Sequence, residues 1–152
     1  MYVNIEANIK PALRPIILII FAAKIAKIAI PTIDSAIGSV ANYFSEHGWQ
    51  EGQIAVQIEA DDIEESVFNV SLRPSSTVGE MRTLGVKVNA EPEASVSPMK
   101  LLGKEGAEYW LGFNNFYVIT RYNHSKLYAM AVFQLSEALR DSLNDQIVGS
   151  YR

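Results

Sequence analysis

Residues 115–135, NFYVITRYNHSKLYAMAVFQL, carry the clearest structural pattern in this chain. Directly after Asn114 and Asn115 it predicts a short helix over residues 116–121. Ser125 has the side chain of a helix N-cap, so a longer helix is predicted to follow it. The apolar side chains of that helix recur at the spacing of one buried face, namely Tyr128, Ala131, Val132, Leu135, Ala138 and Leu139. The end of the chain is therefore predicted to be helical and packed on a core.

Another helix is predicted nearer the start, over residues 36–44. We expect Asp34 or Ser35 to cap its N-terminus and Gly48 to end it. Its apolar face has the i, i+3, i+4, i+7 spacing of an amphipathic helix, at Ile37, Val40, Ala41 and Phe44.

Residues 53–97 between these helices favour strands, because Ile54, Val56 and Ile58 alternate with Ala55 and Gln57. The other expected elements are strands at 67–72, 86–88 and 99–102, turns at 73–76, 91–93 and 103–106, a short helix at 78–84, and a strand or buried loop at 109–113. The order helix, small sheet, helices predicts the α+β class, with a small antiparallel β subdomain of about residues 53–98 inserted between helices that pack together.

Composition sets limits on the class of protein. With 152 residues and 49% hydrophobic content, the chain is long enough for one domain with a core. Thirteen basic and seventeen acidic residues sum to −4, so nothing supports a nucleic-acid partner, which would require a basic face. The chain has no cysteine, which excludes disulfides, thiolate metal sites and cysteine nucleophiles.

Residues 1–33 differ in charge from the rest of the chain. They carry four basic side chains and one acidic side chain, a net of +3, so residues 34–152 carry −7. The apolar run 16–23 follows basic residues, as in a signal peptide, but Lys24 and Lys27 leave it short of the about 20 apolar residues of a membrane span. Three interpretations stay open: an export or membrane-surface element, an amphipathic helix packed on the domain, or an artefact of gene truncation.

No cofactor or metal is predicted. The two histidines, His47 and His124, each lie in a local helix-end motif and match no metal-binding spacing. One acidic run could hold calcium, but it lacks the loop spacing and central glycine of such a site, so a solvated loop is predicted for Glu59, Asp61, Asp62, Glu64 and Glu65.

Aromatic side chains gather near the end of the chain, where seven of the fifteen lie between residues 109 and 128. Residues 120–125 alternate polar and aromatic groups. A tyrosine ring can stack on a sugar and its hydroxyl can orient that sugar, while Asn123 offers a donor and an acceptor to an acetamido group. From spacing alone, Tyr122 and Tyr128 are either core aromatics with hydroxyls at the surface or part of such a carbohydrate-binding wall.

Two long motifs carry a resemblance to a known family. Residues 36–44 with His47-Gly48-Trp49, and residues 115–125 with 128–132 and 134–135, resemble the C-terminal part of the membrane-bound lytic murein transglycosylase B family. The resemblance covers roughly residues 34–140. It implies a lysozyme-like helical core interrupted by a small β-rich subdomain, in agreement with the pattern above.

The resemblance also implies an activity. Enzymes of this family cleave the bond between N-acetylmuramic acid and N-acetylglucosamine in peptidoglycan without water, which leaves a 1,6-anhydromuramoyl end. One glutamic acid first donates a proton to the glycosidic oxygen and then accepts one from the C6 hydroxyl. Position by position, the family residues that line the glycan cleft match Tyr43, Tyr122, Asn123 and Tyr128.

The chain departs from the family at the catalytic acid. That glutamate lies in a Glu-Ser motif upstream of the stretch matching residues 36–40, and residues 1–33 contain nothing similar. Glu65-Ser66 falls in the divergent sheet, so no catalytic residue is assigned. A calcium loop of the relatives is also missing. We therefore expect residues 34–152 to be the C-terminal part of a transglycosylase catalytic domain, truncated before its acid, and residues 1–33 to have no family counterpart.

Two hypotheses follow. The chain is a lytic transglycosylase by descent that lacks its catalytic glutamate, or it is a non-catalytic protein of the cell envelope that binds peptidoglycan glycan strands. Either places it in the periplasm or envelope if it is exported. Membrane association through residues 1–33 follows only if that segment is an export or membrane-surface element. Helices shaped for a missing N-terminal partner would expose apolar surface, so self-association is also predicted.

Overall fold

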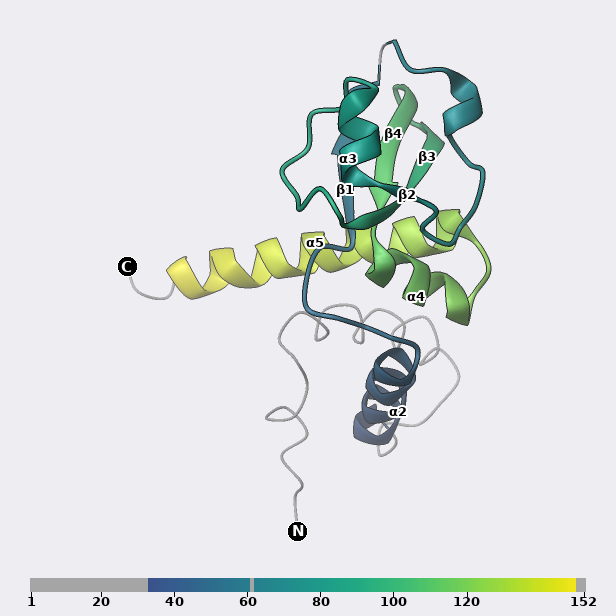
Figure 1. The fold of residues 1–152 in the computed structure, drawn as a ribbon. Helices are drawn as coiled ribbons and strands as arrows, with labels where there is room; N and C mark the ends of the chain where they lie inside the picture. Colours follow the sequence, from purple (N-terminus) through teal and green to yellow (C-terminus); the bar gives the residue numbers. More distant parts are fainter. Residues whose placement is uncertain (1–32, 61, 150–152) are drawn as a thin grey trace. The chain divides into compact units, whose positions relative to one another are not determined.

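The computed structural model describes residues 33–60 and 62–149, and the predictions for residues 1–32 lie outside this range (Figure 1). The chain divides into two compact units, Gly48–Ala129, and Met1–His47 together with Met130–Arg152. None of the helices in the described ranges is long and apolar enough to cross a membrane.

A four-stranded antiparallel sheet lies within the Gly48–Ala129 unit, in the order β1-β4-β3-β2 (Figure 1). The strands are β1 at Ala55–Ile58, β2 at Ser76–Thr77, β3 at Ser95–Gly103 and β4 at Gly106–Gly112. The expected turn at 103–106 is confirmed as the two-residue connection of the β3–β4 hairpin, in which Gly103 pairs with Gly106. Residues 109–113, left open as a strand or a loop, are mostly strand.

The hydrophobic core of the sheet is completed by a short helix. This helix, α3 at Val78–Thr83, confirms the expected helix at 78–84 to within one residue. Its N-terminus has a capping box, because the Thr77 side chain accepts from the Glu80 N–H and the Glu80 carboxylate accepts from the Thr77 N–H. The buried cluster combines Val78 and Met81 of this helix with Ile58, Val86, Val96 and Leu111.

The strand expected at 67–72 is wrong. Val67 ends a single 3₁₀ turn, Glu65–Val67, and Asn69 has a φ of 60°, which interrupts an extended strand. Asn69 pairs with β3 in place of a ladder: its N–H donates to the Pro98 carbonyl at 2.9 Å and its side chain bonds both backbone groups of Lys100. The hydrogen bonds of Asn69 therefore take the place of those that a strand would form with β3.

The strand expected at 86–88 is also wrong. Val86 is buried, but its N–H donates to the Met81 carbonyl at 3.1 Å, which ties it to the end of α3. The Arg82 guanidinium donates to the carbonyls of Val88 and Ala90, at 2.9 and 2.7 Å. Both carbonyls accept hydrogen bonds from the Arg82 side chain, so they do not require the N–H groups of a neighbouring strand.

The predicted helices at 36–44, at 116–121 and after Ser125 are present, but some of their ends differ from the prediction. Their bounds are α2 at Ile33–Glu46, α4 at Asn114–Tyr122 and α5 at Lys126–Gly149. Asp34 and Ser35 lie inside α2, so the expected cap at either residue is wrong. Gly48, with a φ of 87°, follows the helix as expected. The Ser125 cap is confirmed, because its Oγ accepts from the Tyr128 N–H at 3.2 Å.

The buried face of α5 differs from the predicted one. Ala129, Val132 and Ser136 are buried, whereas three members of the predicted face, Ala131, Leu135 and Ala138, are exposed. The Ser136 hydroxyl donates to the Phe133 carbonyl at 2.7 Å, so this polar side chain is buried without a lost hydrogen bond. A prediction from the hydrophobic pattern counts serine as a surface residue, so it placed the buried face of α5 on the side of the leucines.

Candidate functional site

The turn between α4 and α5 brings together three of the four residues predicted to bind glycan. Tyr122 is the last residue of α4, and Asn123 follows in an extended conformation, with φ −141° and ψ 116°. The Asn123 carbonyl accepts from the Ser125 N–H at 2.6 Å, and the Ser125 cap then places Tyr128 in the first turn of α5. The backbone of this turn is therefore held by local hydrogen bonds.

Exposure and charge suit these side chains to contact with a neutral polar ligand. Tyr122 and Tyr128 are half-buried, and Asn123 is exposed. Burial raises the pKa of the Tyr128 phenol above its ordinary value, and the neighbouring Tyr122 phenol raises it further. The Tyr128 hydroxyl is therefore protonated at neutral pH and can donate, while half-buried rings keep part of an apolar face accessible.

Tyr43, the fourth predicted residue, belongs to α2 in the other compact unit. It is half-buried, and its ring stacks on His47 with centroids 3.8 Å apart and planes 25° apart. Its carbonyl accepts from the His47 N–H at 3.0 Å and lies 2.7 Å from His47 Nδ1. His47 thus has a local role at the helix end, as its place before Gly48 predicted.

Two asparagines that the sequence marked only as a helix boundary hold the loop of residues 48–52 to α4. The buried Asn115 accepts from the Gln50 N–H at 3.0 Å and donates to the Gln50 carbonyl at 2.8 Å. Asn114 donates to the Gly48 carbonyl at 2.7 Å. An Asn-Asn pair directly before a predicted helix was the available signal, but its partners lie more than 60 residues away, where local spacing does not indicate them.

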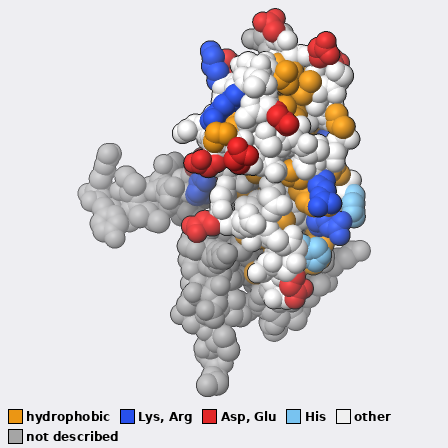
Figure 2. Space-filling view, in the orientation of Figure 1, with side chains coloured by type: hydrophobic (Ala, Val, Ile, Leu, Met, Phe, Trp, Pro, Cys, Tyr) orange, Lys and Arg blue, Asp and Glu red, His pale blue; other side chains and the backbone are white. Residues whose placement is uncertain are grey.

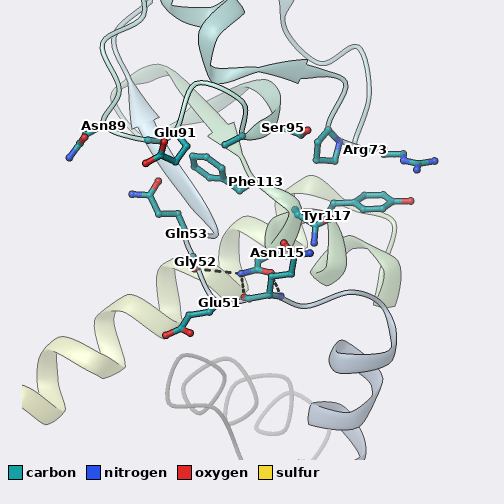
Figure 3. Close-up of a pocket in the computed structure, with 15 residues that line it drawn as sticks. Glu51, Gly52, Gln53, Arg73, Asn89, Glu91, Ser95, Phe113, Asn115 and Tyr117 are labelled. Atoms are coloured by element: carbon teal, nitrogen blue, oxygen red, sulfur yellow. Dashed lines mark hydrogen bonds between the residues drawn. The ribbon is translucent and has the colours of Figure 1, made fainter.

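A cavity of about 840 Å³ lies beside this loop, within the Gly48–Ala129 unit (Figure 3). Neither Tyr122, Asn123 nor Tyr128 lines it. Its walls come from the ends of the strands, from the loop after α3 and from the N-terminal turn of α4. Among the lining residues are Glu51, Arg73, Glu91, Phe113, Asn115 and Tyr117.

No aspartate or glutamate is buried among residues 40–60, 62–138, 140 and 141, the positions whose side-chain burial the structure describes. The carboxylates near aromatic groups include Glu108, which is half-buried and accepts from the Trp110 indole N–H at 3.2 Å. In the acidic run Asp61 lies outside the described residues, and Glu65 pairs with Lys100. The other three, Glu59, Asp62 and Glu64, are exposed.

The described residues contain no cluster of three or more His, Cys, Asp or Glu side chains that could hold a metal ion. Figure 2 shows acidic, basic and apolar side chains interspersed over the visible face of the described part.

The fold and the grouped tyrosines define the class: an α+β domain of lysozyme-like architecture, as found in lytic transglycosylases. The family model described as "Transglycosylase SLT domain" matches residues 28–137, and the chain belongs to this family. The prediction of a transglycosylase relationship and of the α+β fold class is confirmed.

Three similar proteins illustrate the relationship. Membrane-bound lytic murein transglycosylase B of Escherichia coli (strain K12) is 41% identical over 110 residues, which cover 68% of this chain and 29% of that protein. The soluble lytic transglycosylase SltB1 of Pseudomonas aeruginosa is 40% identical with a TM-score of 0.68, covering 73% and 38% of the two chains. SltB3 of the same organism, solved in complex with NAG-NAM-pentapeptide, is 25% identical with a TM-score of 0.61, covering 71% and 30%. The chain thus matches only 29–38% of the length of these proteins.

Proposed function

We propose that this chain binds the glycan strands of peptidoglycan as the C-terminal part of a lytic transglycosylase catalytic domain, without supplying the catalytic acid. The observation that carries the proposal is the α4–α5 turn, where Tyr122, Asn123 and Tyr128 lie together in a member of a transglycosylase family. Tyr43 is proposed as a further glycan contact, because it matches a cleft residue of the family. The solved relative that holds a NAG-NAM-pentapeptide supports a peptide-bearing glycan as the ligand.

The chemistry of these groups fits the proposal. Tyrosine ring faces stack on the apolar faces of sugar rings, and phenol hydroxyls bond the sugar hydroxyls. The exposed Asn123 amide can both donate to and accept from an acetamido group. Such uncharged contacts suit a neutral glycan better than an anionic polymer. Because the substrate is cell-wall material, the proposed location is the cell envelope, and a relative named as membrane-bound agrees with it.

The proposal is tested by co-sedimentation of the purified full chain with insoluble peptidoglycan. We expect the wild-type chain to sediment with it, and Tyr122→Ala or Asn123→Ala to weaken binding by about fivefold or more, the loss of roughly 1 kcal/mol. Lys104→Gln, at the tip of the β3–β4 hairpin, is the matched control. A wild-type chain that stays in the supernatant would refute the proposal, as would binding unchanged in both variants.

Digestion of the same peptidoglycan, with mass analysis of the soluble products, tests the chemical step. We expect no 1,6-anhydromuropeptides from this chain alone, because no residue of it matches the family's catalytic glutamate. Their appearance would show that this polypeptide carries the acid and that the sequence prediction of a missing catalytic residue is wrong.

A further inference from the structure

Asn69, in the loop before β2, makes hydrogen bonds both to the sheet and to helix α5. Its N–H donates to the Pro98 carbonyl at 2.9 Å, and its side chain bonds the carbonyl and the N–H of Lys100 at 3.1 and 3.2 Å. Its Oδ1 atom also accepts a hydrogen bond of 2.7 Å from the Lys126 ammonium group. Lys126 is the first residue of α5, so this contact joins the helix to the sheet across 57 positions, within the Gly48–Ala129 unit.

The partners of the Asn69 side chain use both of its functional groups. Its Oδ1 faces two groups that can only donate, the Lys100 N–H and the Lys126 ammonium, and its amide nitrogen faces a carbonyl, which can only accept. The φ of 60° at Asn69 lies in the left-handed region, which glycine, asparagine and aspartate adopt most readily. Asparagine therefore meets the requirements of this backbone and of these partners at once.

The position of Lys126 is unfavourable for helix α5 itself. A positive charge in the first turn of a helix opposes the helix dipole, and the first turn of α5 holds no acidic side chain to offset it. Lys126 is also half-buried, so it loses part of its solvation. The hydrogen bond to Asn69 accounts for this placement, because it directs the ammonium group toward the sheet.

Lys126 lies within the segment that carries the proposed glycan contacts, three residues after Asn123 and two before Tyr128. Two bonds of Ser125 fix the local shape of this turn: its N–H donates to the Asn123 carbonyl, and its Oγ accepts from the Tyr128 N–H. These two bonds do not tie the turn to the sheet, because both of their partners lie within the turn. The bond between Lys126 and Asn69 does.

We propose that Asn69 and Lys126 are positioning residues for glycan binding: their hydrogen bond holds the α4–α5 turn against the sheet subdomain, so that its side chains are arranged before the glycan arrives. Preorganised groups bind more tightly because less conformational entropy is lost on binding. The inference rests on the proposed function for the identity of the ligand. Neither Asn69 nor Lys126 is assigned a contact with the sugar, so their effect on affinity passes through the turn.

Co-sedimentation of the full chain with insoluble peptidoglycan tests the inference in three variants. Asn69→Gly removes the side chain and tolerates the φ of 60°, Lys126→Met removes the ammonium group, and the third variant combines the two. We expect each single substitution to weaken binding by about three- to fivefold. The double variant should bind no more weakly than the weaker single variant, because both substitutions remove the same hydrogen bond.

Two further substitutions separate positioning from general damage. Asn69→Asp loses the same donor to Lys100 as Asn69→Gly does, but it keeps an acceptor for Lys126, so it should bind within about twofold of wild type. Lys104→Met, at the tip of the β3–β4 hairpin, makes the same change as Lys126→Met at a distant lysine and should leave binding unchanged.

Amide hydrogen exchange reports on the turn without any glycan. The Ser125 N–H donates to the Asn123 carbonyl and the Ala129 N–H to the Ser125 carbonyl, so both amides should exchange faster in Asn69→Gly and in Lys126→Met. The Val86 amide, which donates to the Met81 carbonyl at the end of α3, should exchange as in wild type.

Unchanged binding in both single variants would overturn the inference and leave the proposed function standing. Weaker binding in Lys126→Met alone would also overturn it, because that result indicates a direct contact of Lys126 with the glycan, and so would additive losses in the double variant. If Asn69→Gly does not fold, Lys126→Met decides: unchanged exchange of the Ser125 and Ala129 amides would overturn the inference. A wild-type chain that stays in the supernatant would overturn the proposed function and this inference with it.

Discussion

Replacement of Asn115 by alanine is the sharpest test of how the chain joins its sheet to α4. Asn115 is 3% exposed, and its side chain forms hydrogen bonds of 2.8 and 3.0 Å with the two backbone groups of Gln50. A third contact, to the Gly52 carbonyl, is 3.5 Å long and contributes little. Alanine removes these bonds and leaves partly buried backbone groups without partners.

The expected cost follows from those two groups. An unsatisfied buried donor or acceptor costs about 1–3 kcal/mol, and partial access to water keeps each near the lower end, so Asn115→Ala should lower the free energy of unfolding by about 2–4 kcal/mol. In a chain of this length that corresponds to a fall in Tm of about 5–15 °C. Thermal and urea unfolding followed by circular dichroism measure both quantities. Amide hydrogen exchange of residues 48–54 should also accelerate.

Asn114→Ala is the matched control, because its side chain makes one hydrogen bond, to the Gly48 carbonyl, and is only half-buried. It should cost about 0.5–1.5 kcal/mol. If Asn115→Ala melted within 1 °C of wild type, or if the two variants were equally destabilised, the reasoning that Asn115 holds the loop would be refuted.

Three other perturbations test separate parts of the fold. Tyr128→Phe should reduce the loss of stability above about pH 10. The folded-state pKa of the Tyr128 phenol is raised, so its contribution to stability is complete below the ordinary tyrosine pKa and is lost as pH rises through the folded-state pKa. Urea unfolding from pH 7 to 11 measures this, and identical slopes would contradict it. Ser125→Ala should cost about 1 kcal/mol while Ser125→Asp restores it, since both side chains can cap α5; equal losses in chemical denaturation would argue against the cap. Gly112→Ala should cost about 1–3 kcal/mol, because its new methyl would lie 3.0 Å from both Met99 Cε and Phe116 Cδ1; an unchanged Tm would show that this contact yields freely.

Local patterns predicted the elements whose ends are marked by local chemistry. The α3 helix has its capping box in Thr77 and Glu80, and α5 has its cap in Ser125. The β3–β4 turn has glycines at both ends of its loop. These signals require only neighbouring residues, so they survive in any tertiary context.

The predictions that failed depend on partners distant in sequence. Asn69 finds its hydrogen bonds 31 residues away, on Lys100, and thereby replaces an expected strand by a loop. Ser136 enters the buried face of α5 because its hydroxyl is satisfied inside the helix, which a hydrophobic pattern cannot register.

For the candidate site, sequence motifs were enough to identify the family and the residue types of the α4–α5 turn, because these residues lie within seven consecutive positions. Glu51, Arg73 and Glu91 are separated by up to 40 positions, and their place around one cavity became apparent from the fold. Strand order and the Asn115 hydrogen bonds bring those loops together, and neither is encoded in the spacing of the charged residues themselves.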